Sequence, residues 1–166
     1  MSGDQVGAGI AVDRTHEAEN DAARARLQAL VAGSSDADLA RPMPGGWTVA
    51  GVLAHVATWD ARAIYWIDTW GPTGEPTTYT EENTEAVNES AKPLCLALRT
   101  RDAADLALRL ADGSDAKVKA LSDAMLAKIQ AKGAPPFNLA RAIHRNEHLD
   151  DIERVLRGQH RAAARC

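Results

Sequence analysis

Apolar residues recur at intervals of three and four along most of the chain, which is the spacing of helices with one buried face. The first such stretch begins near Asp13 and ends at Gly33, a residue type that favours the end of a helix. A second long helix is predicted from Thr48, whose hydroxyl can cap it, to Trp70, where a Gly-Pro pair follows. The inner stripe of this helix contains Val49, Val52, Val56, Trp59, Ala63, Trp66 and Trp70.

The second half of the chain continues this helical pattern. A short helix is predicted over about residues 81–91 and is expected to break at Pro93, leaving residues 94–98 as an apolar connector over one end of the bundle. A third long helix is predicted over about residues 101–121. The last is predicted to start at a cap on Asn138 and to continue to Gly158. The pattern therefore predicts four long helices and one additional short helix.

The composition agrees with a single all-α domain. The chain has 166 residues, which is enough to bury a core without disulfide bonds. Alanine, leucine and arginine are frequent and runs of β-branched residues are scarce, which favours closely packed helices. We expect one four-helix bundle domain over residues 13–158, a flexible N-terminus over 1–12 and a C-terminal tail over 159–166.

A short repeat relates two of the predicted long helices. Residues 35–41 (SDADLAR) are echoed by residues 122–128 (SDAMLAK), and each copy precedes a turn with proline and then a helix. The helix after the first copy carries His55, and the helix after the second carries His144 at a nearly matching offset. We interpret these two helices as equivalent elements of the fold.

Three histidines form the strongest candidate for a functional site. His144 and His148 are four residues apart on a predicted helix, so both imidazoles leave the same face about one turn apart. Their stripe is otherwise apolar, and His55 likewise lies on the apolar stripe of the second predicted helix. A buried polar group without a partner costs about 1 to 3 kcal/mol, so hydrogen bonds or a metal must compensate these imidazoles.

Either compensation would suit a single histidine, but the spacing of the three favours a metal. An i,i+4 pair joined by a third histidine from an equivalent helix is typical of a metal centre. We predict that His55, His144 and His148 bind one divalent transition metal and leave at least one coordination position open. Zinc is the default by ligand type, although nickel, iron, cobalt or manganese also accept imidazole.

Other side chains are weaker candidates. Trp59 and Asn83 are predicted to shape a substrate pocket, with a core tryptophan and a surface asparagine as the alternatives. Asp60, Asp150 or Asp151 could orient a ligand imidazole, and ordinary surface carboxylates are the alternative for each. No catalytic residue is assigned from the sequence.

Charge and cysteine content narrow the partners and the compartment. The net charge of -4 argues against a nucleic-acid surface. No stretch approaches the roughly 18 to 20 apolar residues that cross a bilayer, so no membrane partner is expected. The two cysteines lack metal-type spacing and indicate a reducing compartment. We expect a cytoplasmic protein that acts on a small molecule.

The segments around the histidines resemble the DinB-like superfamily of helical bundle proteins, which includes the amino-terminal domain of mycothiol-dependent maleylpyruvate isomerase. The resemblance covers roughly residues 14–157 and rests on residues 46–49 (GWTV), 53–60 (LAHVATWD) and 143–152 (IHRNEHLDDI). It implies an up-down-down-up four-helix bundle with a metal at one end, bound by the histidines that match His55, His144 and His148. It also implies a homodimer, since dimers are common in that superfamily.

The resemblance further implies a class of reaction. Characterised members include transferases that use low-molecular-weight thiols such as mycothiol, bacillithiol or glutathione. We therefore predict a metal-dependent thiol S-transferase, in which the ion lowers the pKa of a bound thiol. Two alternatives stay open: a metal-dependent hydrolase that activates water, and a non-catalytic protein that binds a metal or small ligand in a stress response.

Overall fold

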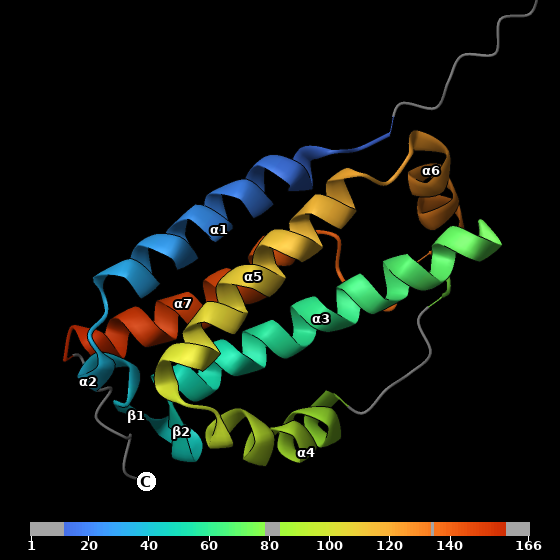
Figure 1. Ribbon diagram of the computed structural model, residues 1–166. Coiled ribbons are helices and arrows are strands. Elements are labelled where there is room, and N and C mark those ends of the chain that lie inside the picture. Colours follow the sequence, from blue (N-terminus) through green and yellow to red (C-terminus); the bar gives the residue numbers. More distant parts are fainter. Residues whose placement is uncertain (1–11, 79–83, 134, 159–166) are drawn as a thin grey trace, which may run out of the picture.

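The computed structural model describes residues 12–78, 84–133 and 135–158, and these residues form an all-α protein (Figure 1), as the apolar pattern predicts. The helices defined in them are α1 (Thr15–Gly33), α2 (Asp36–Leu39), α3 (Val49–Thr73), α4 (Thr84–Ala97), α5 (Thr100–Lys119), α6 (Asp123–Lys132) and α7 (Arg141–Leu156). A short antiparallel hairpin precedes α3 and consists of β1 (Pro42–Met43), the 3-10 turn η1 (Pro44–Gly46) and β2 (Trp47–Thr48). The segments predicted as a flexible N-terminus and a C-terminal tail lie outside the described residues, apart from Val12.

The long helices α1, α3, α5 and α7 pack side by side around one main core (Figure 1). Helices α1 and α3 each contact both α5 and α7. Large aliphatic side chains of the other helices, such as Leu27, Leu53 and Ile152, belong to this core together with fully buried alanines of α5. Those alanines are Ala103, Ala104, Ala107 and Ala111. Because alanine is small, α5 can lie close to its neighbours, which explains the alanine-rich composition.

Helix α3 starts where the sequence predicts and ends slightly later. The hydroxyl of Thr48 accepts a hydrogen bond from the Gly51 N–H at 3.0 Å and caps the first turn. The predicted end at Trp70 is wrong, because the helix continues through Pro72 to Thr73. Gly74 closes it in the left-handed conformation with φ 64°, which a residue without a side chain adopts at no steric cost.

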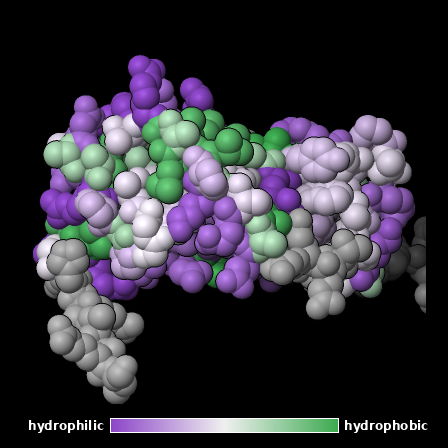
Figure 2. Space-filling view, turned by 90° about the horizontal axis from the view of Figure 1, so that it is seen from below, coloured by the Kyte–Doolittle hydropathy of each residue, from purple (hydrophilic) through white to green (hydrophobic). Residues whose placement is uncertain are grey.

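The predicted break at Pro93 is wrong. Helix α4 runs through this proline to Ala97 and lies along α3, where Cys95 is buried in the main core. Packing of this kind can compensate for the single backbone donor that proline lacks. Leu94 is 74% exposed and Leu98 is 40% exposed, so the segment predicted as an apolar connector consists of the last turn of α4 and of Leu98 just beyond it, with an apolar outer surface. Figure 2 shows the face of the molecule that carries α4, with apolar residues gathered in one area.

The two copies of the sequence repeat form the starts of the short helices α2 and α6. Ser35 accepts the Asp38 N–H at 3.1 Å, and the Asp38 carboxylate accepts the Ser35 N–H at 3.1 Å, which is a capping box. Ser122 accepts the Met125 N–H at 3.2 Å in the same way. The repeat therefore encodes the starts of two short helices, which the sequence analysis did not predict.

The cap predicted at Asn138 lies just before the last helix. Its side chain accepts the Ala140 N–H at 2.9 Å, while α7 itself begins at Arg141 with Ala140 as the N-cap residue. In the described parts of the chain, no helix is both long enough and apolar enough to cross a membrane.

Replacing Ser35 with alanine is expected to lower the free energy of unfolding by about 1 kcal/mol, because the capping hydroxyl of α2 is lost. Urea unfolding followed by circular dichroism measures this change. Ser35→Thr keeps the hydroxyl and should stay within a few tenths of a kcal/mol of the parent protein. Equal losses in the two variants would contradict the assigned role of the hydroxyl.

Candidate metal centre

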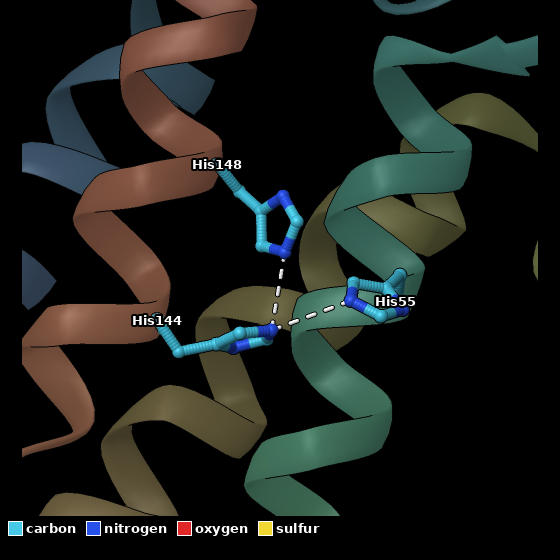
Figure 3. Close-up of side chains that lie close together, drawn as sticks. All are labelled: His55, His144 and His148. Atoms are coloured by element: carbon cyan, nitrogen blue, oxygen red, sulfur yellow. Dashed lines mark hydrogen bonds between the residues drawn. The ribbon is translucent and has the colours of Figure 1, made fainter. Parts of the chain in front are cut away.

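The three predicted histidines converge between α3 and α7. His55 comes from α3, while His144 and His148 come from successive turns of α7, and Figure 3 shows the imidazoles pointing toward one another. Nε2 of His144 lies 3.1 Å from Nε2 of His148 and 3.3 Å from Nε2 of His55. One possible ligand atom from each residue lies within 4.8 Å of the others. The structure thus brings together all three residues that the sequence singled out.

Hydrogen bonds alone account poorly for this arrangement. An imidazole nitrogen carries either one proton or one lone pair, so it forms one good hydrogen bond in the ring plane. Nε2 of His144 faces two other Nε2 atoms, and only one of these contacts can be such a bond. A tetrahedral metal with metal–nitrogen distances of about 2.0 to 2.1 Å places its nitrogen ligands about 3.3 Å apart. Two of the three nitrogen separations therefore match those of ligands of one ion, and the third nitrogen pair lies within 4.8 Å.

The protonation states of the histidines also suit metal binding. Burial lowers the pKa of His55 to about 4, with a smaller contribution from His148. Burial lowers the pKa of His144 to about 2, and the charge that His148 gains when it is protonated and the charge of Arg141 act in the same direction. The pKa of His148 is lowered by burial as well. All three imidazoles are therefore neutral at pH 7, which is the form that donates a lone pair to a metal.

A buried ion-pair network joins the two helices that carry the histidines. The carboxylate of Asp60 on α3 is fully buried and accepts hydrogen bonds from the Nε atoms of Arg141 at 2.9 Å and Arg145 at 3.1 Å. Ser114 of α5 donates to the same carboxylate at 3.2 Å, and Arg145 also donates to Asp115 at 2.8 Å. The interior next to the histidines thus holds two guanidinium groups compensated by two carboxylates.

Neither alternative foreseen for Asp60 is correct. It does not orient an imidazole, and it is not a surface carboxylate, because both of its oxygens are bound by the arginines of α7. Asp60 lies five residues after His55 on α3, and Arg141 and Arg145 flank His144 on α7. The same contacts therefore hold α3 and α7 in the register that places His55 opposite His144.

The other two carboxylates that were candidates for orienting an imidazole are used elsewhere. Asp150 accepts a hydrogen bond from Arg26 at 2.7 Å, and Asp151 accepts one from Arg154 at 2.5 Å. Among the described residues, the buried Nδ1 atom of His144 has no hydrogen-bond partner. The orientation of this imidazole therefore comes from packing rather than from a carboxylate.

Trp59 lies against the candidate metal centre. Its ring centroid is 6.0 Å from that of His144 and 6.4 Å from that of His55. Its indole N–H donates to Oδ1 of Asn88 on α4 at 3.0 Å. Asn83, the other predicted pocket residue, lies outside the described residues. Asn88 was missed, since the sequence pattern does not show which face of α4 turns toward α3.

A cavity of about 780 Å³ borders the histidines, and His55 and His148 belong to its lining. The hairpin, α3, α4 and α7 form its walls. Its apolar part is provided by Met43, Trp47, Val52 and Val155. This volume is in the range of about 300 to 1,000 Å³ that is usual for small-molecule sites. A ligand in the cavity can therefore reach the histidine cluster.

The fold and the site together define an all-α protein with a candidate three-histidine metal centre beside a small-molecule cavity. The sequence profile of the DinB superfamily matches residues 19–149, a span that includes His55, His144 and His148. The chain belongs to the DinB superfamily. No curated protein and no solved structure gives a significant match.

Replacing Asp60 with asparagine is expected to lower the free energy of unfolding by about 3 to 5 kcal/mol, because two buried guanidinium groups lose their compensating charge. Denaturant titration measures the loss. Asp68→Asn on the same helix removes a half-exposed carboxylate that pairs with Lys117, and it should lose no more than about 1 kcal/mol. Similar losses in both variants would show that the buried network does not join α3 to α7 as described.

The metal-free protein is expected to lose stability as the pH falls from 7 to 5.5. Unfolded histidines bind protons near pH 6.5, whereas the pKa values of His55 and His144 in the folded protein are about 4 and about 2. Near and below pH 6.5 the unfolded state therefore binds more protons than the folded state. Each fully titrating histidine then lowers the free energy of unfolding by about 1.4 kcal/mol per pH unit. Urea unfolding at several pH values tests this, with His144→Gln expected to show a shallower dependence. A flat profile in this range would contradict the neutral cluster.

Proposed function

We propose that this protein is a metal-dependent transferase that uses a low-molecular-weight thiol such as mycothiol. The observation that carries the proposal is the convergence of three neutral imidazoles beside a cavity large enough for a small molecule. His55, His144 and His148 would hold one divalent transition metal, with zinc favoured by ligand type and nickel also compatible. When bound, the metal lowers the pKa of a coordinated thiol, so that the thiolate is available at neutral pH.

The transfer step forms one bond and breaks another. The sulfur lone pair of the thiolate forms a bond to an electrophilic carbon, and the leaving group departs with the electron pair of its bond to that carbon. The thiol proton has passed to solvent before this step. The apolar part of the cavity, which includes Met43, Val52 and Val155, would exclude water from the thiolate and so keep it nucleophilic. Membership of the DinB superfamily supports this reaction class. Characterised members of that superfamily include transferases that use low-molecular-weight thiols.

We also propose that the four long helices run up-down-down-up, as the resemblance to this superfamily implies. Contacts between α1 and α7 follow the same order along both helices, whereas contacts between α3 and α7 follow opposite orders. The contacts that support this are Asn20 with Ala142, Arg26 with Glu153, His55 with His144 and Asp60 with Arg141. Asp60 with Ser114 and Asp68 with Lys117 give α3 and α5 the same direction.

The metal centre predicts a specific loss of metal binding. Wild-type protein loaded with zinc and then dialysed should retain about one equivalent, measured by elemental analysis. His148→Ala is expected to weaken zinc binding by roughly 100-fold or more. Loss of a residue that only hydrogen-bonds to a metal ligand already costs about 10- to 100-fold, and loss of a ligand should cost more. Glu147→Ala changes the exposed neighbour on α7 and should bind zinc like the wild type. Full occupancy of His148→Ala would rule out this ligand set.

The reaction class is tested by incubating metal-loaded protein with a general electrophile and, in turn, mycothiol, bacillithiol and glutathione. We expect thioether formation with at least one thiol, and loss of this activity after the metal is removed by a chelator. Product formation is followed by mass spectrometry. Metal binding without turnover of any thiol would reject the transferase and leave the hydrolase and the non-catalytic binding protein as alternatives.

A further inference from the structure

Helix α4 is anchored to α3 by its last turn. Among the residues of α4, all of which the structure describes, only Cys95 is buried, and its sulfur lies 3.9 Å from the hydroxyl oxygen of Thr58 on α3. The next residue, Leu96, packs against Gly51, where an added Cβ atom would lie 2.8 Å from the Cδ2 atom of Leu96. Both contacts come after Pro93 in the sequence, so the anchor lies beyond this proline.

The part of α4 before the proline forms a wall of the cavity. Thr84, Glu85, Asn88 and Glu89 line the cavity from this part, and α7 lines it as well. None of the residues from 84 to 92 is buried, and α4 packs mainly against α3 (Figure 1). This wall can therefore move without exposing a buried side chain of its own.

Pro93 separates the anchored turn from the cavity wall. Because proline has no backbone N–H, the carbonyl group of Glu89 lacks its helical hydrogen bond, and the proline ring crowds the same carbonyl. Sharp bends in helices occur mostly at such positions. Thr84 lies nine residues before Pro93, so a bend of about 20° would move it by roughly 5 Å. A small bend at the proline is thus enough to widen or narrow the cavity.

Two contacts hold the wall in its position against the rest of the molecule. The indole N–H of Trp59 donates a hydrogen bond to Oδ1 of Asn88 at 3.0 Å. The ammonium group of Lys92 donates to the carbonyl oxygen of Gly45 at 2.6 Å and lies 5.2 Å from the ring centroid of Trp47. Asn88 is farther from the proline than Lys92, so its hydrogen bond resists a bend at Pro93 with the longer lever arm.

We propose that residues 84–92 of α4 are a lid over the cavity, which turns about Pro93 and is held closed by the hydrogen bond from Trp59 to Asn88. Opening admits a small molecule to the histidine cluster, and closure completes the wall around it and excludes water. The inference goes beyond the proposed function, because such a lid serves a transferase, a hydrolase or a binding protein equally.

The reactivity of a thiol placed inside the cavity tests the lid without any metal or substrate. Val52 is buried and lines the cavity, so Val52→Cys places a thiol there. Its reaction with dithiobis(nitrobenzoate) is followed by peptide mass spectrometry, which separates it from Cys95 and Cys166. Adding Asn88→Ala is expected to raise the rate roughly two- to tenfold, because the lid loses one hydrogen bond. Adding Pro93→Ala is expected to lower the rate, because the helical hydrogen bond to Glu89 is restored.

The matched control is Asn146→Ala on α7. Asn146 accepts a hydrogen bond from Arg26 at 3.1 Å and lies outside the cavity lining, so its loss removes the same kind of contact elsewhere. The control should leave the rate unchanged.

A second measurement does not depend on Val52→Cys. Spin labels on Ala86→Cys and Ile143→Cys, at exposed positions of α4 and α7, report the distance between the lid and α7 in a Cys166→Ser background. Cys95 is buried and is not expected to be labelled. Asn88→Ala should increase the share of the longer distances.

Three outcomes would overturn the lid. The first is an unchanged thiol reactivity and an unchanged distance distribution in Asn88→Ala. The second is an equal rise in reactivity in Asn146→Ala, which would indicate general loosening of the protein. The third is a Pro93→Ala variant that reacts as fast as its parent, since the hinge would then not lie at Pro93.

Discussion

The buried carboxylate of Asp60 is the contact on which the geometry of the candidate site depends. It binds Arg141 and Arg145 of α7 from its place on α3, in an interior where an uncompensated charge is very unfavourable. A buried ion pair adds little net stability compared with apolar packing, but it penalises every arrangement in which its partners separate. A shift of α7 by one turn along α3 would leave at least one of the two guanidinium groups without its carboxylate, because Arg141 and Arg145 are one turn apart. The network therefore specifies the register of the helices, and that register places His55 opposite His144.

The small side chains of α5 make this network possible. Buried alanines let α5 approach the core closely, and the same helix then supplies Ser114 and Asp115 to Asp60 and Arg145. Arg24 of α1 contacts Asp115 at 3.0 Å from the other side. All four long helices therefore contribute to one connected set of charges. The alanine-rich composition thus allows the close helix packing, and that packing brings α5 to the charges that position the histidine site.

Local patterns predicted the elements that depend on local physics. The i,i+4 spacing of His144 and His148 and the apolar stripes predicted the long helices and the three histidines that converge. The repeat proved to mark the serine caps of α2 and α6, a local feature as well. The partners of Asp60 could not be predicted, because they lie 81 and 85 residues away in the sequence and depend on helix register. The role of Asn88 and the continuation of α4 through Pro93 depend on packing against α3, which periodicity does not contain.

The charge balance of the interior favours an anionic ligand at the histidine cluster. Asp60 and Asp115 already compensate Arg141 and Arg145, so these carboxylates are not available to neutralise a further cation. Three neutral imidazoles would add no negative charge to the two positive charges of a divalent ion at this site, where His55 is buried. A thiolate in the open position would remove one of these charges, whereas a neutral ligand would remove none. The distribution of charge on α3, α5 and α7 is thus a physical reason for a ligand that ionises when it binds.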